Sequence, residues 1–161
     1  TTEFYTLSLH DALPISLALL DGIIDIYMPD FKFWDPDLAH RACGARDYPA
    51  VAREALMEMH RQVGNLVIDK TGIARRGLLV RHLVLPRGMA GTGEIMRFIA
   101  EKISRNTYVN IMPQYRPCGR AAEVEGLAGY PSRSDFEAAV KAARDAGITR
   151  LDEPRRIFTM V

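Results

Sequence analysis

The chain has 161 residues, of which 48% are hydrophobic and 25% charged, and its formal net charge at pH 7 is +1. This composition is ordinary for a globular domain and argues against disorder. The charges are spread without a basic block, so neither nucleic acid nor an anionic membrane surface is an expected partner. No apolar run approaches the ~20 residues that span a bilayer, and no leader pattern opens the chain, so we expect a cytoplasmic protein.

The first sixteen residues, TTEFYTLSLHDALPIS, do not share the periodicity of the rest of the chain. Residues 5–15 back-translate to a sequencing-library adapter read in frame, so we interpret residues 1–16 as translated adapter and exclude them from functional reasoning. The alternative is a genuine N-terminal segment. With the adapter removed, the chain is expected to be the C-terminal fragment of a longer gene product. The expected parts are a domain at 17–152 and a tail at 153–161.

Beyond residue 17, apolar runs alternate with segments of helical periodicity. The predicted strands are 23–28, 78–86 and 108–113, with a hairpin at 66–74, and the predicted helices are 38–42, Tyr48–Val63, 94–103 and 134–146. Ser134 and Glu137 have the spacing of a capping box at the start of the last helix. Nearly continuous apolar strands separated by helices predict an α/β fold with a parallel sheet covered by helices. Either half of a barrel or a small doubly wound sheet would fit this order.

The stretch IIDIYMPDFKFWDP, residues 23–36, places two opposite charges directly after a predicted strand. Asp30 and Lys32 are spaced i, i+2, so in extended backbone both side chains point to the same side. Open α/β sheets and barrels bind ligands at the carboxyl ends of their strands. The pair therefore predicts a site for a zwitterionic ligand such as an amino acid group, with a surface salt pair as the alternative.

Arg81 is a second unusual charge, because it lies inside the predicted strand 78–86. In a strand that is buried on both faces an unpaired cation is costly, so Arg81 needs a carboxylate or a ligand anion as its partner. Asp30, Asp25 and a ligand are all candidate partners. Tyr115 follows the next predicted strand and is expected at the same edge of the sheet.

Other polar positions carry weaker signals. Cys43 and Cys118 lack metal-ligand spacing and are expected to be small, half-buried side chains. His60 and His82 have no second nitrogen or thiolate at metal spacing, so no metal ligand is assigned. The glycines around 91–93 match neither phosphate-binding fingerprint, which favours a turn that begins a helix.

Several ordered motifs between residue 19 and about residue 152 resemble the C-terminal half of radical S-adenosylmethionine proteins related to pyruvate formate-lyase activating enzyme. The chain resembles especially an uncharacterised branch with the motifs MPDFKFWDP, VRHLV(M/L)PG and MxQYRP. Here these motifs are residues 28–36, residues 80–88 with Arg87 inserted before the glycine, and residues 112–117. The resemblance implies the C-terminal half of a partial (β/α)6 barrel of TIM type, a parallel sheet covered by helices.

The resemblance also assigns roles to five residues as cofactor contacts. It implies that Asp30 accepts hydrogen bonds from the ammonium of the methionine group and that Lys32 pairs with its carboxylate, which agrees with their charges. Arg81 and Leu83 would line the nucleoside portion. Tyr115 stands where activating enzymes have a histidine and would take the place of that residue at the cofactor. No residue of this chain is assigned a catalytic role.

The family's reaction needs a 4Fe-4S cluster on a CxxxCxxC loop, a reductant and a substrate, which in activating enzymes is a glycine of a partner protein. The resemblance implies that the full-length protein cleaves S-adenosylmethionine to a 5′-deoxyadenosyl radical that abstracts hydrogen. This chain has two cysteines, Cys43 and Cys118, and neither matches a cluster position. We therefore expect the parent protein to be an enzyme and the fragment alone to be inactive.

Two other classes of protein remain open. The first is a barrel of aldolase or isomerase type that binds a phosphate or carboxylate substrate, with Lys32 as base or Schiff-base former. The second is a non-catalytic module that binds a protein partner at the edge of the sheet. The sequence upstream of residue 17 discriminates, because a CxxxCxxC loop there favours the radical enzyme.

Overall fold

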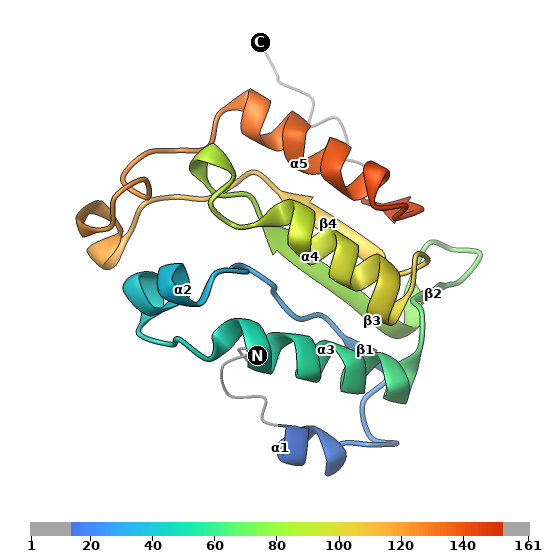
Figure 1. Cartoon of the computed structure of the whole chain (residues 1–161). Coiled ribbons are helices and arrows are strands. Elements are labelled where there is room, and N and C mark those ends of the chain that lie inside the picture. Colours follow the sequence, from blue (N-terminus) through green and yellow to red (C-terminus); the bar gives the residue numbers. More distant parts are fainter. Residues whose placement is uncertain (1–13, 153–161) are drawn as a thin grey trace, which may run out of the picture.

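Helices and strands alternate along residues 14–152, the part of the chain that this computed structural model describes (Figure 1). The helices are α1 (Pro14–Ala18), α2 (Pro36–Cys43), α3 (Tyr48–Val63), α4 (Thr92–Phe98) and α5 (Arg133–Asp145). The strands are β1 (Ile26–Tyr27), β2 (Val67–Ile68), β3 (Ala74–Leu83), β4 (Tyr108–Met112) and β5 (Arg150–Leu151). Three further turns are η1 (Pro86–Gly88), the π-helical η2 (Ile99–Ile103) and η3 (Gly119–Glu123). The predictions for residues 1–13 and 153–161 lie outside the described residues.

The sheet has five strands, and its main path runs in the order β1-β3-β4-β5. Each pair along this path is parallel, whereas β2 pairs antiparallel with the first part of β3. The predicted α/β class with a parallel sheet is therefore confirmed. Parallel pairing places the carboxyl ends of β1, β3 and β4 at one edge, where the loops to α2, η1 and η3 begin.

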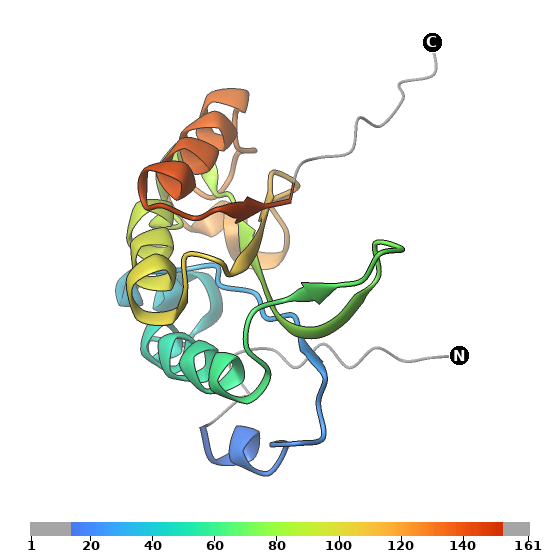
Figure 2. The same cartoon turned by 90° about the vertical axis from the view of Figure 1, so that its right-hand side faces the viewer.

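The helices cover one face of this sheet. Figure 2 shows α3, α4 and α5 on the same side of the strands. Residues of β3 alternate accordingly: the buried ones are Leu78, Val80 and His82, and the half-buried ones are Leu79, Arg81 and Leu83. The prediction of a strand buried on both faces was wrong, because a run of apolar residues does not report which faces have a covering layer. Arg81 lies on the half-open face.

Local sequence signals explain where the helices near the site begin and end. The Asp35 side chain accepts a hydrogen bond from the Leu38 backbone N–H at 2.7 Å, which caps the start of α2. α2 ends at Gly44, whose φ of 76° is readily adopted only by glycine. α3 has the predicted bounds and ends before Gly64, which also has a positive φ.

Three predicted boundaries were wrong. Strand 23–28 is reduced to β1, because regular pairing covers only Ile26 and Tyr27. The second arm of the predicted hairpin continues without a break into the predicted strand 78–86, so both form the single strand β3. The capping box of α5 is formed by Ser132 and Asp135, two residues earlier than predicted.

The residues after β1 are anchored by an aromatic cluster. Phe31 is fully buried, and its ring centroid lies 6.2 Å from that of Trp34, 6.4 Å from that of Tyr48 and 6.3 Å from that of Phe98. The Tyr48 and Phe98 rings meet it edge-on, a favourable arrangement for aromatic pairs. Burial of Phe31 between helices α3 and α4 thus fixes the segment that carries Asp30 and Lys32.

Candidate functional site

A charged cluster forms where β1 and β3 diverge at the carboxyl edge of the sheet. Asp30 Oδ1 accepts from Arg81 Nε at 2.6 Å, and Asp30 Oδ2 lies 3.1 Å from Lys32 Nζ. The exposed fractions of these side chains are 20% for Asp30, 28% for Arg81 and 41% for Lys32. The cluster is thus desolvated enough to have fixed geometry and open enough to be reached by a small molecule.

This geometry decides between the two aspartates considered as partners of Arg81. Asp30 is its partner, whereas Asp25 lies 4.0 Å from Arg76 instead. One carboxylate therefore faces two cations, and the cluster carries an excess positive charge. Such a cluster attracts a ligand that brings a carboxylate or another anionic group.

The backbone of the site is held by a short extension of the sheet. The Phe31 N–H donates to the Arg81 carbonyl at 2.8 Å, and the Arg81 N–H donates to the Pro29 carbonyl at 2.9 Å. These bonds make an isolated parallel bridge between Asp30 and Arg81. Because Pro29 has no N–H of its own, regular pairing cannot continue through it. The two charged side chains therefore meet where the ladder is coming to an end.

Tyr48, at the start of α3, contacts the same segment from the helix layer. Its hydroxyl donates to the Asp30 carbonyl at 3.0 Å and accepts from the Lys32 N–H at 3.0 Å. Burial raises the pKa of Tyr48, and the nearby Asp30 adds to the increase. The hydroxyl therefore keeps its proton at neutral pH and can act as both donor and acceptor.

His82 is the fully buried neighbour of Arg81 on the helix-facing side of β3. Its Nδ1 lies 2.7 Å from the Phe31 carbonyl oxygen, and its Nε2 lies 2.9 Å from Thr92 Oγ1. Burial lowers the pKa of His82 to about 4, so the imidazole is neutral at pH 7. Since a carbonyl can only accept, Nδ1 carries the proton and Nε2 accepts from the Thr92 hydroxyl.

The other two predicted contacts lie in a neighbouring apolar cluster. Leu83 ends β3 and is paired with Met112 of β4. Leu83 and Tyr115 both pack against a small core of Leu38, Leu85, Ala90, Val124 and Leu127. The Tyr115 hydroxyl donates to the Leu127 carbonyl at 2.7 Å. The structure thus unites Asp30, Lys32 and Arg81, whereas Leu83 and Tyr115 belong to the apolar cluster, in which the Tyr115 hydroxyl is engaged by backbone.

Sequence reasoning missed Tyr48 and His82 as parts of this site. The sequence pattern identifies Tyr48 only as the start of a helix, and its two backbone partners lie 16 and 18 residues away. His82 was considered from the sequence only as a metal ligand, and that role was not assigned. A usable signal was its position between Val80 and Val84, because an imidazole on a buried face must find hydrogen-bond partners.

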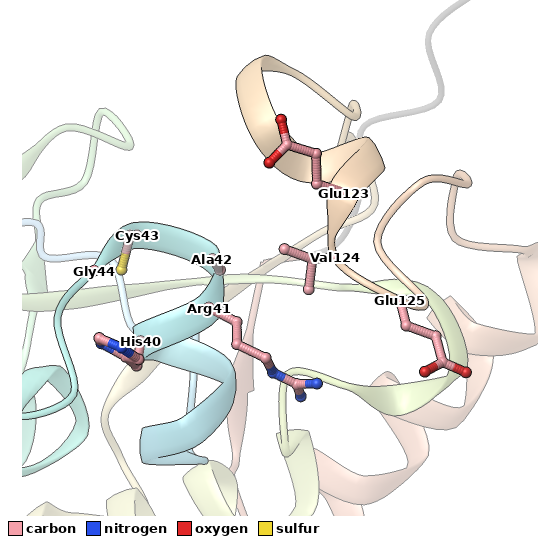
Figure 3. Close-up of a pocket in the computed structure, with 8 residues that line it drawn as sticks. All are labelled: His40, Arg41, Ala42, Cys43, Gly44, Glu123, Val124 and Glu125. Carbon is pink, nitrogen blue, oxygen red and sulfur yellow. The ribbon is translucent and has the colours of Figure 1, made fainter.

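A separate cavity of about 790 Å³ opens between the end of α2 and the end of η3. Figure 3 shows the α2 residues on one side and the loop that carries Val124 on the other. Its lining is His40, Arg41, Ala42, Cys43, Gly44, Glu123, Val124 and Glu125. It lies at the same edge of the sheet as the charged cluster, since α2 follows β1 and η3 follows β4, but none of the five predicted contacts lines it.

The prediction that the two cysteines are half-buried was wrong. Cys43 and Cys118 are both exposed, and neither forms a disulfide. Cys43 is the last residue of α2, where its Sγ donates to the Ala39 carbonyl at 3.0 Å, and Cys118 precedes η3. Each cysteine is followed by a glycine, Gly44 or Gly119, which has no side chain to cover the thiol.

Residues 14–152 contain no group of three or more histidine, cysteine, aspartate or glutamate side chains arranged to hold a metal ion. No helix in the same range is both long enough and apolar enough to cross a lipid bilayer.

Comparisons with known proteins identify a distant relative. No family model and no solved structure matches the chain. The chain is similar to an uncharacterized protein of Methanocaldococcus jannaschii, with 28% identity over 128 residues that make up 79% of this chain. The match covers 33% of that protein, so the chain spans about one third of the length of the curated relative. The relative's name states no activity, so function has to be argued from the site.

Proposed function

We propose that this chain is the C-terminal half of a partial (β/α)6 barrel from a radical S-adenosylmethionine enzyme related to glycyl-radical activating enzymes. The observation that carries the proposal is the Asp30 carboxylate held between Lys32 and Arg81 at the carboxyl edge of a parallel sheet. The sheet has one face covered by helices and one half-open face that bears Arg81. A half-barrel has this arrangement, because its inner face is completed by further strands.

The charges suit the methionine group of S-adenosylmethionine, which carries an ammonium and a carboxylate. Lys32 Nζ lies 3.1 Å from Asp30 Oδ2, so the two charges form an ion pair with each other. We infer that the ligand exchanges this pair: its ammonium takes the place of Lys32 on Asp30, and its carboxylate receives Lys32. Arg81 keeps its bond to Asp30 throughout and holds that carboxylate in place. Its role at the site is therefore to orient Asp30, in addition to any contact with the nucleoside.

The residues of this chain do not fit the cluster that the family's reaction requires. Two cysteines are fewer than a CxxxCxxC loop contains, and Cys43 and Cys118 belong to different elements. When bound, the cluster supplies the electron that cleaves the cofactor, but no step of that reaction is assigned to residues of this chain. The proposal is that the chain holds the methionine group, and that the cluster ligands, the reductant and a protein substrate belong to the activity of the full-length enzyme.

The aldolase or isomerase alternative depends on Lys32 as a nucleophile or base. A lysine with that role is activated in an apolar pocket or beside another cation. Lys32 instead contacts a carboxylate and is 41% exposed. The geometry thus favours a lysine that binds a carboxylate over one that attacks a carbonyl. A protein-binding module, the third class, remains as an outcome of the experiment below.

The test uses the full-length protein encoded with the upstream sequence of the gene. After anaerobic reconstitution, iron and sulfide are measured, and reductant is added to look for 5′-deoxyadenosine. We expect a 4Fe-4S cluster and cleavage of S-adenosylmethionine, whereas the 161-residue chain gives neither. A full-length protein without cluster and without cleavage would refute the assignment and favour one of the other classes.

A matched pair of variants connects this activity to the site. Asp30→Asn keeps the shape of the side chain but loses its charge, so binding of S-adenosylmethionine is expected to weaken about tenfold to a hundredfold. The control is Asp37→Asn, because Asp37 is an exposed aspartate paired with Arg46 at 2.7 Å on the surface. Equal affinities in the two variants would remove Asp30 from the binding site.

A further inference from the structure

The segment Asp30-Phe31-Lys32 carries the two ligand-binding charges yet lies beyond the regular part of β1. Because β1 pairs regularly only at Ile26 and Tyr27, the strand ladder alone does not hold this segment. The two peptide groups inside this segment are nonetheless fully engaged. The Phe31 N–H donates to the Arg81 carbonyl, and the Phe31 carbonyl accepts from His82 Nδ1. Tyr48 Oη contacts both the Asp30 carbonyl and the Lys32 N–H. Just before the segment, the Pro29 carbonyl accepts from the Arg81 N–H.

One hydroxyl joins the backbone on both sides of Phe31. Tyr48 Oη donates to the residue before Phe31 and accepts from the residue after it, each at 3.0 Å. The distance between the Asp30 carbonyl and the Lys32 N–H is therefore set by a single atom of α3. The Tyr48 ring is itself fixed by edge-on contacts to Phe31 at 6.4 Å and to Phe33 at 5.8 Å.

The imidazole of His82 holds the middle of the segment from the other direction. Its Nδ1–H donates to the Phe31 carbonyl at 2.7 Å, which is a short distance for a bond of this type. Its Nε2 accepts from the hydroxyl of Thr92, the first residue of α4. A neutral imidazole with both nitrogens engaged has a single tautomer and a single ring orientation. β3 and α4 thereby fix the peptide that follows Asp30.

We propose that Tyr48 and His82 are positioning residues of the zwitterion site, which hold the backbone of Asp30 and Lys32 at the spacing that the two ends of an amino acid group require. The inference rests on the proposed function, because it concerns the same site and ligand. Neither side chain touches the ligand in this scheme. Each acts by removing backbone freedom that would otherwise be lost on binding, so its removal weakens affinity more than turnover.

Two replacements of His82 separate its two hydrogen bonds. The side-chain amide nitrogen of asparagine is as many bonds from Cα as Nδ1, and that of glutamine is as many bonds from Cα as Nε2. His82→Asn can therefore keep the donor to Phe31, whereas His82→Gln keeps a contact near Thr92 and loses the donor to Phe31. Asparagine is one methylene smaller than glutamine and leaves the larger cavity at this buried position, so a loss of packing alone would weaken His82→Asn at least as much as His82→Gln.

The experiment measures equilibrium binding of S-adenosylmethionine and the rate of 5′-deoxyadenosine formation in the reconstituted full-length protein. Tyr48→Phe keeps the ring and removes the hydroxyl, and we expect affinity to fall about tenfold while kcat stays within about twofold. The affinity of His82→Gln for S-adenosylmethionine should fall by a similar factor, whereas that of His82→Asn should stay near the wild-type value. Tyr130→Phe is the control, because Tyr130 is 68% exposed.

The outcomes distinguish this inference from the proposed function. A wild-type protein that does not bind S-adenosylmethionine overturns both. A wild-type protein that binds, together with unchanged affinity in Tyr48→Phe and His82→Gln, overturns the positioning roles alone. Weakening in His82→Asn that equals or exceeds that in His82→Gln also overturns the role of His82, since it would follow lost volume in the core rather than the lost donor to Phe31. Circular dichroism of each variant verifies that it is folded.

Discussion

Two aspartate–arginine pairs in this protein have the same oxygen–nitrogen distance and opposite surroundings. Asp30 and Arg81 are 51 residues apart and meet at 2.6 Å at the carboxyl edge of the sheet. Asp69 and Arg75 are six residues apart and meet at 2.6 Å in the hairpin between β2 and β3. The arginine of the first pair is 28% exposed and that of the second is 61% exposed.

The hairpin pair belongs to a turn in which Asp69 binds groups of the turn itself. Asp69 Oδ1 accepts from the Thr71 N–H at 2.8 Å, from the Thr71 hydroxyl at 2.6 Å and from the Ile73 N–H at 3.1 Å. The bond from the Thr71 hydroxyl is the largest of the effects that lower the pKa of Asp69 to about 2. The acceptor capacity of this carboxylate serves nearby residues, so it has little left for a ligand.

The carboxylate of the sheet-edge pair has two side-chain partners instead. Asp30 is held by Arg81 through one oxygen and pairs with the more exposed Lys32 through the other. The second contact can be exchanged for a ligand without releasing the first. An identical ion-pair distance therefore does not identify a site. A site also needs a carboxylate with an exchangeable partner and a backbone that several elements hold in place.

The largest expected effect comes from Gly77, which joins the hairpin region to the sheet edge along β3. Its φ is 119°, and a Cβ there would lie 2.4 Å from the Asn65 carbonyl oxygen and 2.5 Å from Leu66 Cα. Both are backbone atoms that cannot turn away, so Gly77→Ala should cost more than about 3 kcal/mol of unfolding free energy. Denaturant unfolding of the 161-residue chain measures it.

The matched control for Gly77 is Gly129→Ala, because a Cβ at Gly129 meets no atom within 4 Å. This change should leave the unfolding free energy within about 0.5 kcal/mol of wild type. Similar stabilities for the two variants would contradict the close approach of β3 to residues 65–66.

The second prediction is that His82 at the sheet edge and Asp69 in the hairpin affect the unfolding free energy in different pH ranges. The pKa of His82 is about 4 in the folded chain and 6.5 in the unfolded chain, so the unfolded state binds the proton first as pH falls. Stability is therefore complete above pH 6.5 and decreases by about 3 kcal/mol as pH falls to 4. The depressed pKa of Asp69 acts in a lower window, and its contribution is lost between pH 3.8 and about 2.

Unfolding free energies measured at intervals between neutral pH and the folded-state pKa of His82 verify this order. In His82→Asn the slope between pH 6.5 and about 4 should disappear, because no titrating group remains at that position. His40→Asn, at an exposed position of α2, should keep the slope. A slope that survives in His82→Asn would show that another group controls acid sensitivity in this range.

The smallest effects are the coupling energies of the two ion pairs. A double-mutant cycle with Asp30→Asn and Arg81→Met should give about 1–2 kcal/mol, largely retained in roughly 1 M salt, because the pair is partly desolvated and charge-assisted. A cycle with Asp69→Asn and Arg75→Met should give a smaller energy that salt abolishes, since that pair is exposed. Equal couplings with equal salt dependence would erase the distinction between the two pairs.

Much of the local structure was predictable. The spacing of apolar residues predicted α3 with its observed bounds, and the apolar run that starts at Tyr108 predicted β4 to within one residue. The hairpin around Asp69 was also predicted from its glycine-containing turn. These features depend on neighbours a few residues apart, so the pattern of the chain contains the information that forms them.

The candidate site was predictable only in part. Asp30 and Lys32 were identified from their spacing after a strand, and Arg81 from the cost of a charge inside one. The pairing of Arg81 with Asp30 was one of several alternatives. The register between β1 and β3 decides which alternative holds. Register is a property of two strands together, so neither strand alone specifies it.

Local periodicity and residue chemistry are enough to predict the α/β alternation, the main helices and the charges at the end of β1. Three features appear only in the folded molecule: the helices cover one face of β3, Arg81 holds Asp30, and Tyr48 and His82 bind the backbone between the two charges. These contacts join residues 16 to 51 positions apart, so no local pattern of the chain contains them. Such contacts exist only once α3, α4 and β3 pack together around Phe31.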